Sequence, residues 1–162
     1  MVLTQTVRAV IDTSSLVPFH LRRDLQQAAQ LGRFEPIWSP WIVAELNCVL
    51  VWRWIEWKGS TSSATERDCS ASAKQMMDYM IPFFTTVDPK PPYPPPWAGL
   101  RDTWDRPIWA AAKVGGARYV VSENTKHFPP LQPDGHHVYE GIEYVRAATF
   151  IALLTGTLER DT

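Results

Sequence analysis

Four acidic residues stand at places where a small chain can bring carboxylates together. Asp12 directly follows the short run 7–11, which is rich in β-branched residues, and Glu45 interrupts an otherwise apolar stretch. Asp102 and Asp105 are three residues apart in a segment predicted to begin a helix, where that spacing puts both on one face. Carboxylates held about 4 Å apart repel by roughly 4 kcal/mol per pair at an effective dielectric near 20, so a cluster of them needs protons or a cation.

The available donor types indicate which cation such a cluster would hold. The chain has two cysteines, Cys48 and Cys69, with no CxxC pair and no Cys and His cluster at zinc-ligand spacing. Hard oxygen ligands without such donors favour Mg²⁺ or Mn²⁺ over Zn²⁺. A carboxylate-bound cation that keeps its water can activate that water, which suits phosphoryl transfer.

Each carboxylate also has an interpretation that needs no function. Glu45 can simply reach solvent from the N-terminal half of its helix, and Asp102 and Asp105 can stabilise a helix N-terminus by ~0.3 to 1 kcal/mol each. The functional interpretation depends on the positions taken together. Asp12, Glu45 and the aspartate pair each follow a predicted strand and lie near the start of a helix, so their side chains can converge on one rim.

The elements that must position these residues alternate along the chain. Strands are expected at 7–11, 37–38, 83–87, 118–121 and 138–145, and helices at 16–32, 40–58, 60–82, 102–115 and 147–154. Such alternation predicts an α/β domain with a mostly parallel sheet. Ligands of open parallel sheets bind at the carboxyl ends of the strands, where Asp12 and the run Ser122-Glu123-Asn124 fall.

Composition limits the class of protein. The 162 residues suit a single domain spanning 1–162, and a net charge of -1 excludes a wholly basic nucleic-acid-binding surface. Six of the fourteen prolines lie within 88–99, which predicts an ordered surface loop. We find no signal peptide and no transmembrane helix in the sequence, so a cytoplasmic location without membrane contact is expected.

Four segments carry the acidic residues in a fixed order. They are Val-Ile-Asp12-Thr-Ser, Ser-Pro-Trp-Ile-Val-Ala-Glu45-Leu, Asp102-Thr-Trp-Asp105-Arg-Pro-Ile-Trp-Ala-Ala-Ala and Tyr-Val-Val-Ser122-Glu-Asn124-Thr-Lys-His-Phe-Pro. Together they resemble PIN-domain ribonucleases of the toxin-type, VapC-like branch, as does the closing stretch 141–154. The resemblance implies a three-layer α/β/α sandwich and a Mg²⁺- or Mn²⁺-dependent endonuclease acting on single-stranded RNA. It also implies a toxin with a cognate antitoxin.

The resemblance assigns roles residue by residue. It makes Asp12, Glu45 and Asp105 catalytic and places them around the metal together with Asn124. Auxiliary roles fall to Asp102, Ser14 and Ser122. Two positions depart from the family pattern, because Ser14 stands where an Asn is frequent and Asn124 stands where the fourth acid is expected. Without that fourth charge, one tightly held cation is favoured over two.

Basic and aromatic residues complete the prediction. Arg101, Arg106, Lys126 and His127 flank the acidic positions and are candidates to contact RNA phosphates. His136 and His137 are adjacent in extended chain and point to opposite faces, so structural roles are expected for both. The four tryptophans of the 40–58 helix cover more than one of its faces, which favours a homodimer interface over base stacking; they are Trp41, Trp52, Trp54 and Trp57.

Two alternatives from other classes can be weighed. A phosphatase of the haloacid-dehalogenase kind needs a second Asp two residues after the first, where Ser14 stands. A catalytically silent PIN-like module that binds RNA or a partner is the stronger alternative, and Asn124 is its best support. The presence of Asp12, Glu45 and Asp105 favours the enzyme.

Overall fold

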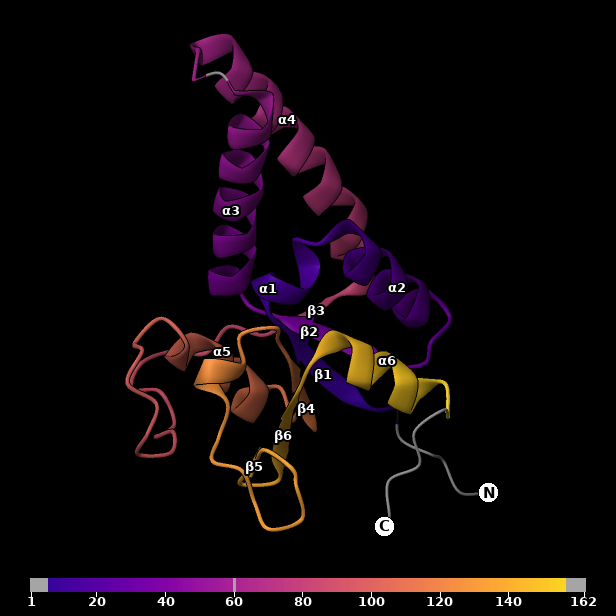
Figure 1. The fold of residues 1–162 in the computed structure, drawn as a ribbon, viewed down its shortest axis with the longest axis vertical. Helices are drawn as coiled ribbons and strands as arrows, with labels where there is room; N and C mark the ends of the chain where they lie inside the picture. Colours follow the sequence, from indigo (N-terminus) through magenta and orange to yellow (C-terminus); the bar gives the residue numbers. More distant parts are fainter. Residues whose placement is uncertain (1–5, 60, 157–162) are drawn as a thin grey trace.

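A mostly parallel β-sheet runs through the computed structural model, which describes residues 6–59 and 61–156 (Figure 1). In that part of the chain the sheet has six strands in the order β3-β2-β1-β4-β6-β5, and every neighbouring pair is parallel except β5 with β6. The strands are β1 (Arg8–Ile11), β2 (Glu35–Trp38), β3 (Thr85–Thr86), β4 (Tyr119–Val121), β5 (Val138–Tyr139) and β6 (Ile142–Val145).

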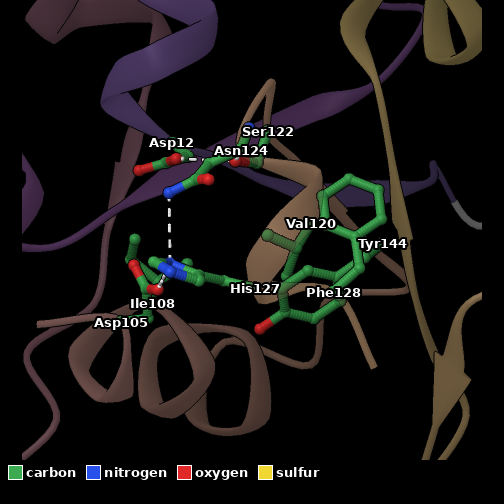
Figure 2. Close-up of a pocket in the computed structure, with 9 residues that line it drawn as sticks. All are labelled: Asp12, Asp105, Ile108, Val120, Ser122, Asn124, His127, Phe128 and Tyr144. Carbon is green, nitrogen blue, oxygen red and sulfur yellow. Dashed lines mark hydrogen bonds and ion pairs between the residues drawn. The ribbon is translucent and has the colours of Figure 1, made fainter. Parts of the chain in front are cut away.

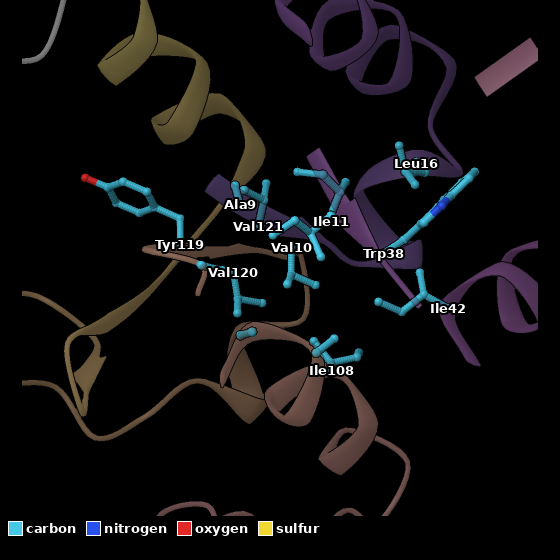
Figure 3. Packing of buried hydrophobic residues seen from close by; sticks show 14 of the residues in the cluster. Ala9, Val10, Ile11, Leu16, Trp38, Ile42, Ile108, Tyr119, Val120 and Val121 are labelled. Atoms are coloured by element: carbon cyan, nitrogen blue, oxygen red, sulfur yellow. The ribbon is translucent and has the colours of Figure 1, made fainter. Parts of the chain in front are cut away.

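Helices cover both faces of this sheet, so the predicted three-layer sandwich is confirmed. Helix α5 packs on one face, whereas α1, α2 and α6 lie on the opposite face (Figure 3). The helices are α1 (Thr13–Leu16), α2 (Phe19–Gln30), α3 (Pro40–Lys58), α4 (Ser63–Met80), α5 (Arg106–Val114) and α6 (Ala147–Leu154), with short 3₁₀ turns η1 (Ile81–Phe83) and η2 (Thr125–His127). In the described residues, no helix combines the length and the apolar character needed to cross a membrane.

The two central strands form the most deeply buried part of the molecule. Val10 and Ile11 of β1, and Val120 and Val121 of β4, are completely inaccessible to solvent. Strands covered on both faces are expected to be continuous apolar runs, as these are. Asp12 directly follows β1, so the first acidic residue projects from the most deeply buried part of the sheet.

The long helix pair α3–α4 projects away from the sheet as a hairpin (Figure 1). Helix α3 begins as predicted, with the Ser39 side chain accepting the Ile42 N–H, and it ends at Gly59 in the left-handed conformation. Residues of one stripe, such as Leu46 and Leu50, are buried. The N-terminal end of α3 therefore sits at the sheet and its C-terminal end stands clear of it.

Two predicted helices begin or continue differently in the structure. The helix expected over 16–32 begins only at Phe19, as α2, because Pro18 has no N–H to continue α1, which ends at Leu16. The helix expected from residue 102 begins only at Arg106, since Pro107 suits a first helical turn. Asp102 and Asp105 therefore lie in a turn ahead of α5, and the expectation that they share a helix face is wrong.

Two predicted strands are shorter than expected. Within 83–87 only Thr85–Thr86 pair as a strand, because Pro82 and its neighbours form the 3₁₀ turn η1. The extended segment expected over 138–145 is a hairpin of β5 and β6, in which Glu140 and Gly141 both take positive φ values, 48° and 77°. Two successive positive φ values match a tight hairpin turn.

The proline-rich segment is fixed to the body by one tryptophan. Residues 87–105, all of them described, form neither helix nor strand. Trp97 within this segment is buried, and its ring centroid lies 5.6 Å from that of Trp109, 5.8 Å from Tyr139 and 5.3 Å from Tyr144. This aromatic cluster fixes the chain shortly before it reaches the turn that carries Asp102 and Asp105.

The close approach of α5 to β2 gives a test of the packing. A Cβ added to Gly115 would lie 2.8 Å from the Ala111 carbonyl oxygen and 3.0 Å from Ile37 Cδ1. We therefore expect Gly115→Ala to lower the free energy of unfolding by about 1–3 kcal/mol in urea denaturation. Gly99→Ala is the control, because its Cβ would make an ordinary 3.5 Å contact with Trp97, and a change below about 0.5 kcal/mol is expected. Equal losses for both variants would contradict this packing argument.

Candidate active site

Asp12 is held in a single orientation by hydrogen bonds from both sides of the β1–β4 pair. Its side chain is only 7% exposed and caps α1, with Oδ1 accepting the Thr13 N–H at 2.8 Å. The hydroxyls of Ser14 and Ser122 each donate to Oδ2 at 2.8 Å. The two serines predicted to be auxiliary thus both contact the first catalytic candidate.

The same two serines join the ends of β1 and β4. Their Oγ atoms lie 3.1 Å apart. Ser14 Oγ accepts the Glu123 N–H at 2.9 Å, and Ser122 Oγ accepts the Asn124 N–H at 3.1 Å. The segment that carries Asn124 is consequently fixed against the segment that carries Asp12.

Glu45 reaches the same rim from the second turn of α3. Its Oε2 accepts the Thr13 hydroxyl at 2.8 Å, so the residue next to Asp12 also orients this carboxylate. Partial burial raises the pKa of Glu45, and repulsion by Asp12, Asp105 and Asp102 raises it further, against the lowering effect of the Thr13 hydrogen bond. All three aspartates therefore lie near enough to Glu45 to repel its negative charge.

Asp105 approaches from the opposite side, at the N-terminus of α5. Its Oδ2 forms an ion pair with Nδ1 of His127, which is also 3.9 Å from Oδ2 of Asp102. Burial raises the pKa of Asp105 to about 6; Asp12 and Asp102 also raise it, while His127 lowers it. Asp102 turns its Oδ1 to the Trp104 N–H at 2.9 Å, which shapes the turn before the helix.

A small cavity separates Asp12 from Asp105 (Figure 2). Its volume is about 10 Å³, close to the space one water molecule requires. Figure 2 shows both carboxylates facing this space from different elements, with His127 beside Asp105. The lining residues are Asp12, Asp105, Ile108, Val120, Ser122, Asn124, His127, Phe128 and Tyr144. The cavity can therefore receive one small ion or water, but no base or sugar.

The other predicted residues lie around or outside this cavity. Arg101, Arg106 and Lys126 are exposed and do not line it. His136 Nδ1 is 3.0 Å from Oε1 of Glu143, and His137 Nδ1 is 2.7 Å from a backbone carbonyl oxygen, so both have structural partners.

Sequence reasoning missed the contribution of Thr13 and the apolar lining. Nothing in the sequence pairs Thr13 with Glu45. Ile108, Phe128 and Tyr144 come from three separate segments of the chain that meet only when it is folded. Their apolar surfaces reduce solvation on one side of the cavity, in keeping with the raised pKa of Asp105.

Comparison with models of protein families matches residues 8–126 to the PIN domain. Because the match covers more than half of the chain and includes Asp12, Glu45 and Asp105, this chain belongs to the PIN-domain family. PIN domains are generally metal-dependent nucleases. The predicted family is confirmed, whereas the toxin-type branch stays a prediction. A search of curated proteins finds no match to this sequence.

The side chains present suit a divalent cation. One ligand atom each from Asp102, Asp105 and His127 lie within 4.8 Å of one another. Oδ2 of Asp105 is buried, and its ion pair with His127 is its polar contact among the described residues. Carboxylate oxygens and one imidazole nitrogen form a donor set typical of hard and borderline divalent metals.

The raised pKa of Asp105 predicts how its replacement affects stability. The pKa is about 6 in the folded chain against an ordinary value of 3.8, so the folded state binds more protons than the unfolded state between these values. The stability contributed by Asp105 therefore falls as the pH rises through this window. Asp105→Asn should raise the free energy of unfolding at about pH 7.5 in EDTA and leave it nearly unchanged at about pH 4.

Urea denaturation at the two pH values measures this difference. Asp68→Asn, on an exposed part of α4, is the matched control and should show no pH-dependent change. If Asp105→Asn raised the free energy of unfolding as much at pH 4 as at pH 7.5, the ionised carboxylate of Asp105 would not be what destabilises the folded protein.

Proposed function

We propose that this protein is a Mg²⁺- or Mn²⁺-dependent endoribonuclease that cuts single-stranded RNA. The observation that carries the proposal is the arrangement of Asp12 and Asp105 on opposite sides of one cavity at the carboxyl end of a parallel sheet. Membership of the PIN-domain family supports the nuclease class. The chain's own resemblance to toxin-type members is the support for RNA as the substrate.

Asp12, Asp105 and Glu45 would hold the cation, with Asn124 as a neutral ligand. The bound cation would supply an activated water and neutralise charge that develops on the phosphate. Three donors already fix Asp12, so its oxygens need no reorganisation to bind.

The size of the cavity and the residues around it support an RNA phosphodiester as the group that the substrate places over the cavity. A volume of about 10 Å³ excludes a nucleobase, so the RNA would lie across the rim with a phosphate over the cavity. Arg101, Arg106 and Lys126 are exposed on segments that adjoin the rim. We propose that they contact neighbouring phosphates, a role that suits cationic side chains on a protein whose net charge is only -1.

The proposal includes a biological setting. The four motifs in their observed order support the toxin component of a toxin–antitoxin pair, with a small antitoxin as partner. An adjacent gene that encodes such a small protein would support this assignment. Co-purification of its product with this chain would test it directly.

Replacing Asp12 tests the catalytic proposal. Asparagine also caps helices well, so Asp12→Asn should preserve the fold while it removes a charge from the metal site. We expect cutting of a single-stranded RNA in Mn²⁺ to fall by at least about 100-fold. Asp68→Asn is the control and should retain activity.

The remaining outcomes separate the alternatives. Cutting that continues undiminished in EDTA would refute a metal-dependent mechanism. Binding of RNA without any cutting, by wild type and Asp12→Asn alike, would refute the enzyme and favour the silent RNA-binding module.

We also propose a homodimer formed through the free end of α3. Of the four tryptophans, Trp41 and Trp54 pack against the core, whereas Trp52 is 63% exposed and Trp57 is 82% exposed. Burying an indole removes on the order of 150–250 Å² from water, at roughly 25 cal/mol per Å². A symmetric contact between two copies would bury both rings of each chain.

Sedimentation at micromolar concentration tests this association. Wild type should sediment at about twice 18.4 kDa, and Trp52→Glu or Trp57→Glu should yield the monomer. Phe19→Glu is the control, because Phe19 is 67% exposed on α2, a different surface. A monomeric wild type would refute the dimer and assign the exposed rings to RNA or another partner.

A further inference from the structure

We propose that His127 is a ligand of the catalytic cation through Nδ1, and that this nitrogen makes the site select Mn²⁺ over Mg²⁺. The inference rests on the proposed metal dependence and specifies the metal class. His127 is considered in the sequence only as a phosphate contact. The folded chain instead places it among the carboxylates.

The spacing of the donor atoms suits a shared cation. The ligand atoms of Asp102, Asp105 and His127 all lie within 4.8 Å of one another. Two ligands that are each about 2.1 Å from an octahedral ion stand about 3 Å apart when adjacent and about 4.2 Å apart when opposite. Small side-chain rotations thus bring all three donors into one coordination sphere.

Nδ1 is the imidazole nitrogen that faces the carboxylates. It lies 3.1 Å from Nδ2 of Asn124 and forms an ion pair with Oδ2 of Asp105, a buried oxygen (Figure 2). An ion pair requires a proton on the imidazole, and a divalent cation that binds here would release that proton. The nitrogen and the oxygen would then both be ligands of the cation.

The imidazole is presented by a firmly anchored turn. His127 ends the 3₁₀ turn η2, in which its N–H donates to the Asn124 carbonyl at 3.2 Å. The next residue, Phe128, packs edge-on against Tyr144 and His137, with ring centroids 5.6 Å and 5.3 Å apart. The imidazole of His127 is therefore already held beside the carboxylates, and it would lose little conformational freedom when a metal binds.

Nitrogen ligation changes which metals bind well. Mg²⁺ prefers oxygen ligands and retains its waters, whereas imidazole suits Mn²⁺ and later divalent metals better. A site built from carboxylates alone lacks this preference of imidazole nitrogen for Mn²⁺ over Mg²⁺. The ratio of Mn²⁺ to Mg²⁺ affinity should consequently depend on His127.

Three variants of the full chain separate this role from a purely structural one. His127→Ala removes the nitrogen, His127→Asp replaces it with an oxygen ligand, and His20→Ala is the control because His20 is exposed on α2. Calorimetry measures the affinity for Mn²⁺ and for Mg²⁺. Pulsed electron paramagnetic resonance of bound Mn²⁺ detects a directly coordinated ¹⁴N nucleus.

We expect a ¹⁴N coupling in wild type and His20→Ala that is lost in both His127 variants. The affinity for Mn²⁺ should fall by about tenfold or more in His127→Ala, with a smaller loss for Mg²⁺. His127→Asp should recover binding of Mg²⁺ without the nitrogen signal.

Bound Mn²⁺ without a ¹⁴N coupling in wild type, or a coupling that survives His127→Ala, would overturn the inference. Such a result together with RNA cutting that depends on Asp12 would leave the proposed function intact. A nitrogen-coupled Mn²⁺ in a protein that cuts no RNA would support His127 as ligand and overturn the endoribonuclease. Absence of any Mn²⁺ binding would overturn both.

Discussion

The hydrogen bonds between Asp12, Ser14 and Ser122 are the interaction on which the site depends. Asp12 directly follows β1, and Ser122 directly follows the neighbouring strand β4, so the parallel pairing of β1 with β4 sets their separation. A nearly buried carboxylate is costly unless donors satisfy it, and the two hydroxyls with the Thr13 N–H do so. The sheet register, more than any loop, therefore fixes where the first catalytic candidate points.

The other carboxylates are held close to Asp12 even though their burial and mutual repulsion destabilise the folded protein. Burial and mutual repulsion raise the pKa of both Glu45 and Asp105, so neither charge is fully compensated in the protein alone. The buried residues of β1 and β4 and the packing of α5 on them supply the stability that offsets this repulsion. Excess negative charge on a rigid support is the arrangement expected of a cation site.

The order of strands and helices predicts the sandwich and places Asp12 and Ser122 at one rim, because strand ends are readable from apolar runs. The turn that carries Asp102 and Asp105 is not predicted. Pro107 is compatible with a helix that begins at any of several nearby residues, and the local sequence pattern does not decide between them. The pairing of Glu45 with Thr13, and of His127 with Asp105, spans 32 and 22 residues of sequence. Such contacts depend on how α3 and η2 meet the sheet, which no local pattern encodes.

Helix α3 connects the two ends of the molecule to which function is assigned. Glu45 lies in its second turn at the rim, whereas Trp57 lies in its last turn, about 18 Å further along the axis at 1.5 Å per residue. The buried residues Leu46 and Leu50 fix the first part of the helix, so the exposed end extends from a rigid base. Association of two chains at the exposed end would thus leave each rim open. A dimer of this geometry presents two independent sites to RNA, because neither copy needs to cover the cavity of the other.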